Sequence, residues 1–258
     1  MKPSIFIAAS VYGSELVQQH GQAYFAEMAA RSGANGFEVR RELFLEEEPP
    51  LDELREVLED NGLRCAISAS VEIWSPEGDL NEEQLFQTLV EGKQLGAAFV
   101  KTTHGTYVPG RSDLNALRAC LEKAGYMNLP VQLTVENDQS NHGGNPQILR
   151  GFFDGCAEER IPVSMTFDVG NWLWAGEDIC KAAEILAEYV VYVHFKWSED
   201  RNGNGRKTAA PLPADEHAEW RDVLPYFSKY LPRVIEFPII GEDLEQLTRK
   251  YTQLLELA

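Results

Sequence analysis

Four segments in the second half of the sequence alternate apolar with polar residues and then reach an ionisable side chain. In the first of them, Val-Gln-Leu-Thr-Val-Glu, every second residue is apolar and the polar series ends at Glu136. The same pattern leads to Asp168, His194 and Glu236 in the three segments that follow. Successive side chains of a β-strand point to opposite faces, so this period of two indicates strands with one apolar and one polar face. We therefore expect four strands whose polar faces end in these ionisable groups.

These four side chains are of the types that bind a divalent metal ion. If the strand ends meet, three carboxylates and an imidazole share a small, partly buried space, where like charges repel strongly unless they are compensated. One divalent cation would compensate them, and three oxygen donors with one nitrogen suit Mn²⁺, Mg²⁺ or Co²⁺, with Zn²⁺ also compatible. We predict a metal site formed by Glu136, Asp168, His194 and Glu236. The alternative is four unrelated residues, each paired with a nearby Lys or Arg.

The strands that would position these residues recur along the whole chain, about every thirty residues, as in a repeated βα unit. The segments with strand character are Ser4–Ala8, Gly36–Arg40, Leu63–Val71, Phe99–Thr103, Val131–Glu136, Val163–Asp168, Val190–Phe195 and Arg233–Phe237. Amphipathic segments with helix-start signals such as Asn145-Pro146 separate them.

No glycine- or serine-rich linker divides the chain, so we predict one domain over residues 1–258. Its fold class is α/β, a single (β/α)8 TIM barrel, in which the polar faces point to the axis and the site lies at the carboxyl ends of the strands. An open, doubly wound sheet is the alternative. It is disfavoured because no G-x-G-x-x-G turn follows the first strand.

The order of the strand-end motifs resembles that of a known family. The motifs are Val135-Glu136-Asn137, Phe167-Asp168-Val169-Gly170-Asn171, Val193-His194-Phe195-Lys196 and Ile235-Glu236-Phe237. Over essentially its whole length the chain is similar to the xylose isomerase-like TIM barrels. Within these it resembles the sugar-phosphate isomerase/epimerase group, which includes ketose 3-epimerases.

The resemblance implies metal ligation by the four residues and, in addition, acid and base roles for Glu136 and Glu236. The implied reaction is proton abstraction beside the carbonyl of a small sugar, keto-sugar or sugar phosphate, through a metal-stabilised enediolate. The chain departs from many relatives at Asn171, and from several at Asp138, where those relatives have histidine. Asparagine can hydrogen-bond a sugar hydroxyl but does not titrate near neutrality.

Four residues near the expected rim are candidates for binding the substrate. His104 follows the fourth strand, and a structural role is nearly as well supported for it. Asn171 follows Asp168, and Lys196 shares a strand face with His194, where an ion pair with a ligand carboxylate is the alternative. Arg201 lies in a basic, glycine-rich segment after the seventh strand, near the usual phosphate site of such barrels. A polar loop without a binding role is the alternative there.

The composition limits the classes of partner that the protein is expected to bind. The formal net charge of −18 disfavours nucleic acid, which is bound through Lys and Arg. The four cysteines form no C-x-x-C pair and indicate reduced thiols in a cytoplasmic protein. Neither a signal peptide nor a membrane-spanning apolar stretch is evident, so we expect no membrane partner. The expected partner is a small sugar, and a homo-oligomer remains open.

Other functions fit parts of the same pattern. A dehydratase of a keto-polyol, a lyase, would begin with the same proton abstraction on the same site. A barrel that binds carbohydrate without turnover is disfavoured by the complete set of ligand types. A DNA-repair endonuclease needs a cluster of metals and many histidines, whereas this chain has five histidines and a strongly negative charge.

Overall fold

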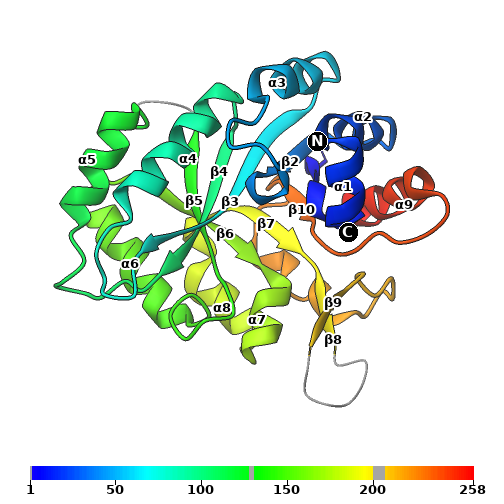
Figure 1. Ribbon diagram of the computed structural model, residues 1–258. Helices are drawn as coiled ribbons and strands as arrows, with labels where there is room; N and C mark the ends of the chain where they lie inside the picture. The colour runs from blue at the N-terminus through cyan, green and yellow to red at the C-terminus, as the bar shows by residue number, and fades with distance from the viewer. Residues whose placement is uncertain (1, 128–130, 200–206) are drawn as a thin grey trace.

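Eight parallel strands close into a barrel in the computed structural model, which describes residues 2–127, 131–199 and 207–258 (Figure 1). The barrel strands are β1 (Ile5–Ala8), β2 (Gly36–Arg40), β3 (Arg64–Trp74), β4 (Phe99–Gly105), β5 (Gln132–Glu136), β6 (Val163–Asp168), β7 (Val190–Phe195) and β10 (Arg233–Ile235). Their order around the barrel is β1-β10-β7-β6-β5-β4-β3-β2, and β1 closes it by pairing with both β2 and β10. The predicted (β/α)8 barrel is confirmed.

Helices cover the outside of the barrel (Figure 1). They are α1 (Ser14–His20), α2 (Gln22–Arg31), α3 (Leu51–Asp60), α4 (Glu82–Gln94), α5 (Leu114–Ala124), α6 (Pro146–Glu158), α7 (Val169–Ala175), α8 (Ile179–Leu186) and α9 (Leu244–Leu257). The start of α6 follows the predicted signal. Asn145 Oδ1 accepts hydrogen bonds from the backbone N–H groups of Gln147 and Ile148, with Pro146 in the first turn of the helix.

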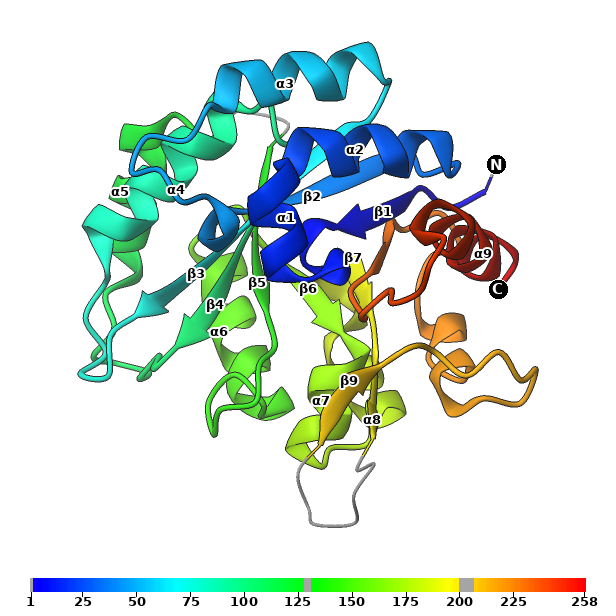
Figure 2. The same ribbon diagram turned by 45° about the vertical axis from the view of Figure 1, so that its right-hand side comes forward.

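The segment between β7 and β10 departs from the expected βα repeat. Among its described residues, β8 (Trp197–Glu199) and β9 (Thr208–Ala210) form an antiparallel hairpin, and short 3-10 turns at Glu219–Arg221 and Leu224–Tyr226 take the place of an α-helix. Figure 2 shows this hairpin beyond the carboxyl end of β6. The hairpin was not predicted, because each of its strands is only three residues long.

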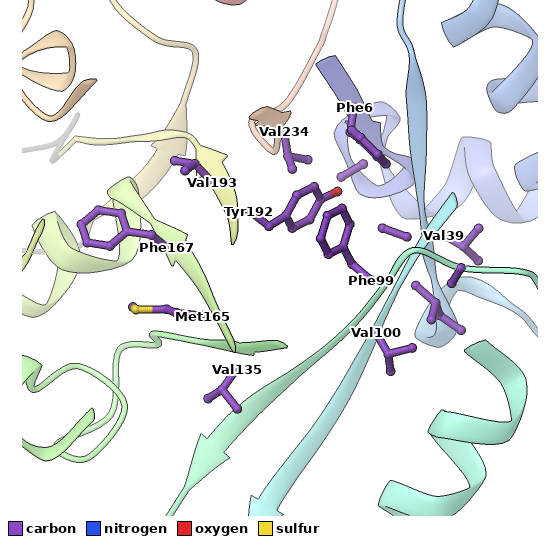
Figure 3. Packing of buried hydrophobic residues seen from close by; sticks show 14 of the residues in the cluster. Phe6, Val39, Phe99, Val100, Val135, Met165, Phe167, Tyr192, Val193 and Val234 are labelled. Carbon is purple, nitrogen blue, oxygen red and sulfur yellow. The ribbon is translucent and has the colours of Figure 1, made fainter. Parts of the chain in front are cut away.

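Aromatic rings fill the amino-terminal part of the barrel interior. The Tyr192 ring stacks on Phe99 at a centroid distance of 4.6 Å and meets Phe6 edge-on at 5.3 Å (Figure 3). We call these three residues the ring layer. Gly36 on β2 makes room for it, because a Cβ there would lie 2.4 Å from the Phe6 ring. The next inward residues after Phe99 and Tyr192 are Lys101 and His194, so charged groups begin directly past the ring layer.

The two ends of the chain lie close together in both ribbon views (Figures 1 and 2), and Lys2 pairs with Glu256 at 3.0 Å. Within the part of the chain that the structure describes, none of the helices has the length and apolar character needed to cross a membrane.

Candidate metal centre

The structure brings together the four residues that end the polar strand faces. Glu136 and Asp168 are the last residues of β5 and β6, His194 lies in β7, and Glu236 directly follows β10. One ligand atom from each lies within 4.8 Å of the other three. The Nδ1 atom of His194 is at the centre, 3.1 Å from Glu136 Oε1, 3.1 Å from Glu236 Oε2 and 3.9 Å from Asp168 Oδ2.

Two of these atoms, Glu136 Oε1 and His194 Nδ1, are buried and make no regular hydrogen bond among the described residues, although they lie 3.1 Å apart. Asp168 Oδ2 is also buried and makes no regular hydrogen bond, but the Lys196 ammonium lies 2.9 Å from it. The other ring nitrogen of His194, Nε2, lies 2.8 Å from Oε2 of the fully buried Glu38. If Nε2 carries the proton and donates it to Glu38, the lone pair of Nδ1 faces the carboxylate oxygens, as in metal sites where a carboxylate orients the histidine. The donor types and their convergence therefore fit a divalent ion.

Positive side chains already compensate the carboxylates. The Lys101 ammonium lies 2.7 Å from Glu136 Oε2, and the Lys196 ammonium lies 2.9 Å from Asp168 Oδ2 and 2.8 Å from Glu236 Oε2. The Arg40 guanidinium lies 2.6 Å from Glu236 Oε1. Pairing with Lys and Arg, the alternative given from the sequence, is therefore present at these carboxylates. The case for a metal ion rests on the convergence of four ligand atoms and not on an excess of negative charge.

The same network shifts the pKa values of its members. Burial lowers the pKa of His194, but Glu38, Glu236 and Glu136 outweigh it and raise that pKa to about 9. Burial raises the pKa of Asp168 to about 7, against the opposing effect of Lys196. For Glu236 the attraction of Lys196 and Lys101 outweighs burial and holds the pKa well below its ordinary value. In the protein alone, the surrounding carboxylates favour the protonated form of His194, so binding of a metal ion through Nδ1 would release a proton.

Two asparagines fix the backbone around Asp168. Asn137 Oδ1 accepts a hydrogen bond from the Asp168 N–H, and Asn137 Nδ2 donates to the Asp168 carbonyl. Asp168 Oδ1 in turn accepts from the Asn171 N–H at 2.7 Å and caps α7. Asn171 Nδ2 donates to the Asn137 carbonyl. With Oδ1 committed to the helix, only Oδ2 of Asp168 faces the other ligand atoms.

The predicted substrate-binding residues fall in different places. The Asn171 side chain is engaged by Asn137 and by Gln139 Nε2, which leaves its predicted sugar contact without support. His104 packs between the rings of Phe152 and Tyr107, and no contact joins it to the four ligand candidates in the described part of the chain. Lys196 lies in the centre itself, in the ion pairs that were its alternative. Arg201 lies outside the described residues.

Sequence reasoning missed four residues of the centre or gave them no role in it. Glu38, Arg40 and Lys101 were not among the predicted site residues, and Asn137 was named only as part of a motif. The signal for three of them was present, because Glu38, Arg40 and Lys101 occupy the inward positions of β2 and β4 by the same alternation that identified Glu136. Asn137 gave no comparable signal, since its role depends on the backbone of a neighbouring strand.

Comparisons with known proteins agree with this architecture. A family model described as the xylose isomerase-like TIM barrel matches residues 26–228. A sequence comparison with curated proteins finds no match. Among solved structures, a fusion of a xylose isomerase-like TIM barrel with 4-hydroxyphenylpyruvate dioxygenase aligns with a TM-score of 0.70 at 15% identity, over 98% of this chain and 42% of the fusion protein.

Two further solved structures match along their whole length. D-allulose 3-epimerase from Methylomonas sp. aligns with a TM-score of 0.70 at 14% identity, over 99% of this chain and 97% of that one. A probable 3-DHS dehydratase from Bacillus anthracis aligns with a TM-score of 0.64 at 14% identity, over 99% and 98%. At such identities the likeness concerns the fold.

Proposed function

Because this chain belongs to the xylose isomerase-like TIM barrel family, we propose that it is a divalent-metal-dependent isomerase or epimerase of a small sugar, keto-sugar or sugar phosphate. The observation that carries the proposal is the convergence of four ligand atoms, which lie within 4.8 Å of one another in the described part of the chain. Glu136, Asp168, His194 and Glu236 would hold one ion, with Mn²⁺, Mg²⁺ or Co²⁺ best suited to the donor set.

Such an ion would polarise a substrate carbonyl and stabilise the negative charge that develops beside it. The protein's own contribution is to place two carboxylates around the substrate. Glu136 on β5 and Glu236 after β10 are separated in the barrel by β6 and β7. They therefore reach the axis from different directions, and one can accept a carbon-bound proton while the other returns one.

Lys101 assists both carboxylates. Its ammonium lies 2.7 Å from Glu136 Oε2 and 3.7 Å from Glu236 Oε1, and its side chain is only 3% exposed. Its positive charge helps to lower the pKa of Glu236, which favours the ionised form that accepts a proton. Lys101 is thus a positioning residue between the acid and the base.

A lyase reaction is the second candidate, because the fold is shared with a probable dehydratase. Removal of a proton beside a carbonyl is the first step of both reactions. They differ in the next step, since a dehydratase expels a hydroxyl group from the neighbouring carbon and an epimerase returns a proton.

Proton exchange with solvent tests the proposal. Protein loaded with Mn²⁺ is incubated in D₂O with a panel of free and phosphorylated ketoses, and the sugars are analysed by mass spectrometry and NMR. We expect deuterium beside the carbonyl of one ketose, and a fall in exchange rate of about 10²- to 10⁴-fold in Glu136→Gln or Glu236→Gln. The matched control is Glu91→Gln. Glu91 is also buried, but it lies outside the centre and pairs with Arg41 at a distance of 2.8 Å.

The outcomes separate the candidates. Exchange with retention of every hydroxyl group supports an isomerase or epimerase, whereas loss of water from the sugar supports the lyase. Exchange with no ketose of the panel would count against proton abstraction altogether. Exchange that survives complete removal of divalent ions would contradict the metal-dependent reaction.

A further inference from the structure

The cations of the centre contact different oxygens of the same carboxylates. Lys101 pairs with Glu136 Oε2, and both Lys101 and Arg40 approach Glu236 Oε1. These oxygens are not the ones that His194 Nδ1 faces, which are Glu136 Oε1 and Glu236 Oε2. Lys101 and Arg40 therefore leave the metal-facing oxygens free.

Lys196 differs in this respect. Its ammonium lies 2.9 Å from Asp168 Oδ2 and 2.8 Å from Glu236 Oε2, which are two of the metal-facing oxygens. Of the Lys and Arg side chains that contact these carboxylates in the described part of the chain, it is the one that pairs with the metal-facing oxygens. An ion coordinated by Asp168 and Glu236 would lie next to this ammonium and repel it strongly.

Lys196 lies on the side of the centre that faces the barrel mouth. Lys196 is the next inward residue after His194 and so lies nearer the mouth of the barrel, and its side chain is 14% exposed where those of His194 and Asp168 are fully buried. Its stem crosses Gly170, where a Cβ would lie 2.4 Å from Lys196 Cγ. The stem is therefore held against α7, while the ammonium at its end can turn toward the open side.

We propose that Lys196 is the counter-cation of the metal-free centre, and that a divalent ion displaces its ammonium from Asp168 Oδ2 and Glu236 Oε2. This inference rests on the proposed function, because it presupposes a metal site. The displaced ammonium would remain on the open side of the centre, where it could donate hydrogen bonds to an oxygen of the substrate. The two roles considered for Lys196 from the sequence, ion pair and substrate contact, become successive states of one side chain.

The inference predicts that removing Lys196 strengthens metal binding. The unmodified protein, Lys196→Met and the control Lys101→Met are stripped of metal and titrated with Mn²⁺, and free Mn²⁺ is measured by electron paramagnetic resonance. Both variants lose one buried positive charge, but only the first frees ligand oxygens. We expect the Kd of Lys196→Met to fall by about tenfold or more relative to Lys101→Met, since an ammonium contact with two carboxylates must otherwise be broken.

Thermal unfolding gives a second measurement on the same proteins. Without metal, Lys196→Met removes a cation that contacts two buried carboxylates and is destabilised, so Mn²⁺ should raise its Tm more than it raises that of the unmodified protein. If Lys196→Met folds only with Mn²⁺, that dependence is the same result in its extreme form. Lys196→Gln, which keeps a hydrogen-bond donor without the charge, replaces it in the titration if it does not fold at all.

Equal Mn²⁺ affinities of the Lys196 and Lys101 variants would overturn the displacement and leave the proposed function standing, because any effect would then come from charge at a distance. Weaker Mn²⁺ binding by the Lys196 variant would overturn it as well. Failure of the unmodified protein and of every variant to bind Mn²⁺ would overturn both the inference and the proposed function.

Discussion

Burial of His104 makes the stability of the protein depend on pH. Its imidazole lies between the rings of Phe152 and Tyr107, at centroid distances of 5.0 Å and 5.9 Å, and is fully buried. Its Nδ1 lies 3.2 Å from the Gly105 carbonyl, and its Nε2 has no hydrogen-bond partner among the described residues. Burial lowers the pKa of His104 from 6.5 to about 4, so the native protein holds it neutral.

The sign and size of the effect follow from this shift. Below the ordinary pKa of histidine the unfolded chain takes up a proton at this position that the native protein resists, so stability is full above that pKa and falls as the pH decreases toward 4. By linkage, His104 alone lowers the free energy of unfolding by about 2 kcal/mol between about pH 7 and about pH 5.

The substitution His104→Phe tests this number. Phenylalanine suits the aromatic surroundings and cannot be protonated. We therefore expect the free energy of unfolding, measured with urea, to fall between these two pH values by about 2 kcal/mol less in the variant than in the unmodified protein. The control is His217→Gln, at an exposed position, which should leave the pH dependence unchanged. Parallel pH dependences of His104→Phe and the unmodified protein would refute the reasoning.

Two further substitutions test the packing that positions the centre. Gly36→Ala should lower the free energy of unfolding by about 1–3 kcal/mol, because its Cβ would lie 2.4 Å from the Phe6 ring. In the double variant with Phe6→Leu, thermal unfolding should show part of the lost stability restored. If the two substitutions instead lower the stability additively, the close contact is contradicted. Asn137→Ala removes both hydrogen bonds to the Asp168 backbone and should cost about 2–3 kcal/mol. It should also weaken Mn²⁺ binding, measured by calorimetry, and unchanged affinity would show that Asn137 does not position Asp168.

The barrel could be predicted from the sequence because its strands carry a strong local signal. The predicted bounds Gly36–Arg40, Val163–Asp168 and Val190–Phe195 coincide with β2, β6 and β7. The β8–β9 hairpin could not be predicted, because its strands are held by pairing with each other and by a hydrogen bond from Ser198 Oγ to the Gly170 carbonyl. Such contacts do not require a regular alternation of apolar and polar residues in the sequence.

The carboxylates of the candidate centre could be predicted from the sequence, whereas its cationic residues could be predicted only in part. The period of two identifies which residues point inward, and it located Glu136 and Asp168 without further information. It does not state which inward residues meet across the barrel. The contact of Lys101 with Glu136 depends on the stagger between β4 and β5, and that of Arg40 with Glu236 joins positions 196 residues apart. The compensation of the carboxylates by Lys and Arg therefore became visible only in the structure.

The central claim is a single divalent ion held by Glu136, Asp168, His194 and Glu236. It is tested most directly by the metal content of the purified protein after incubation with Mn²⁺ and removal of unbound ions, measured by elemental mass spectrometry. We predict about one ion per chain in the unmodified protein and in His104→Phe, and a loss of the ion in His194→Ala, which removes the central ligand. A protein that retains no metal, or a His194→Ala variant that retains as much as the unmodified protein, would contradict the claim.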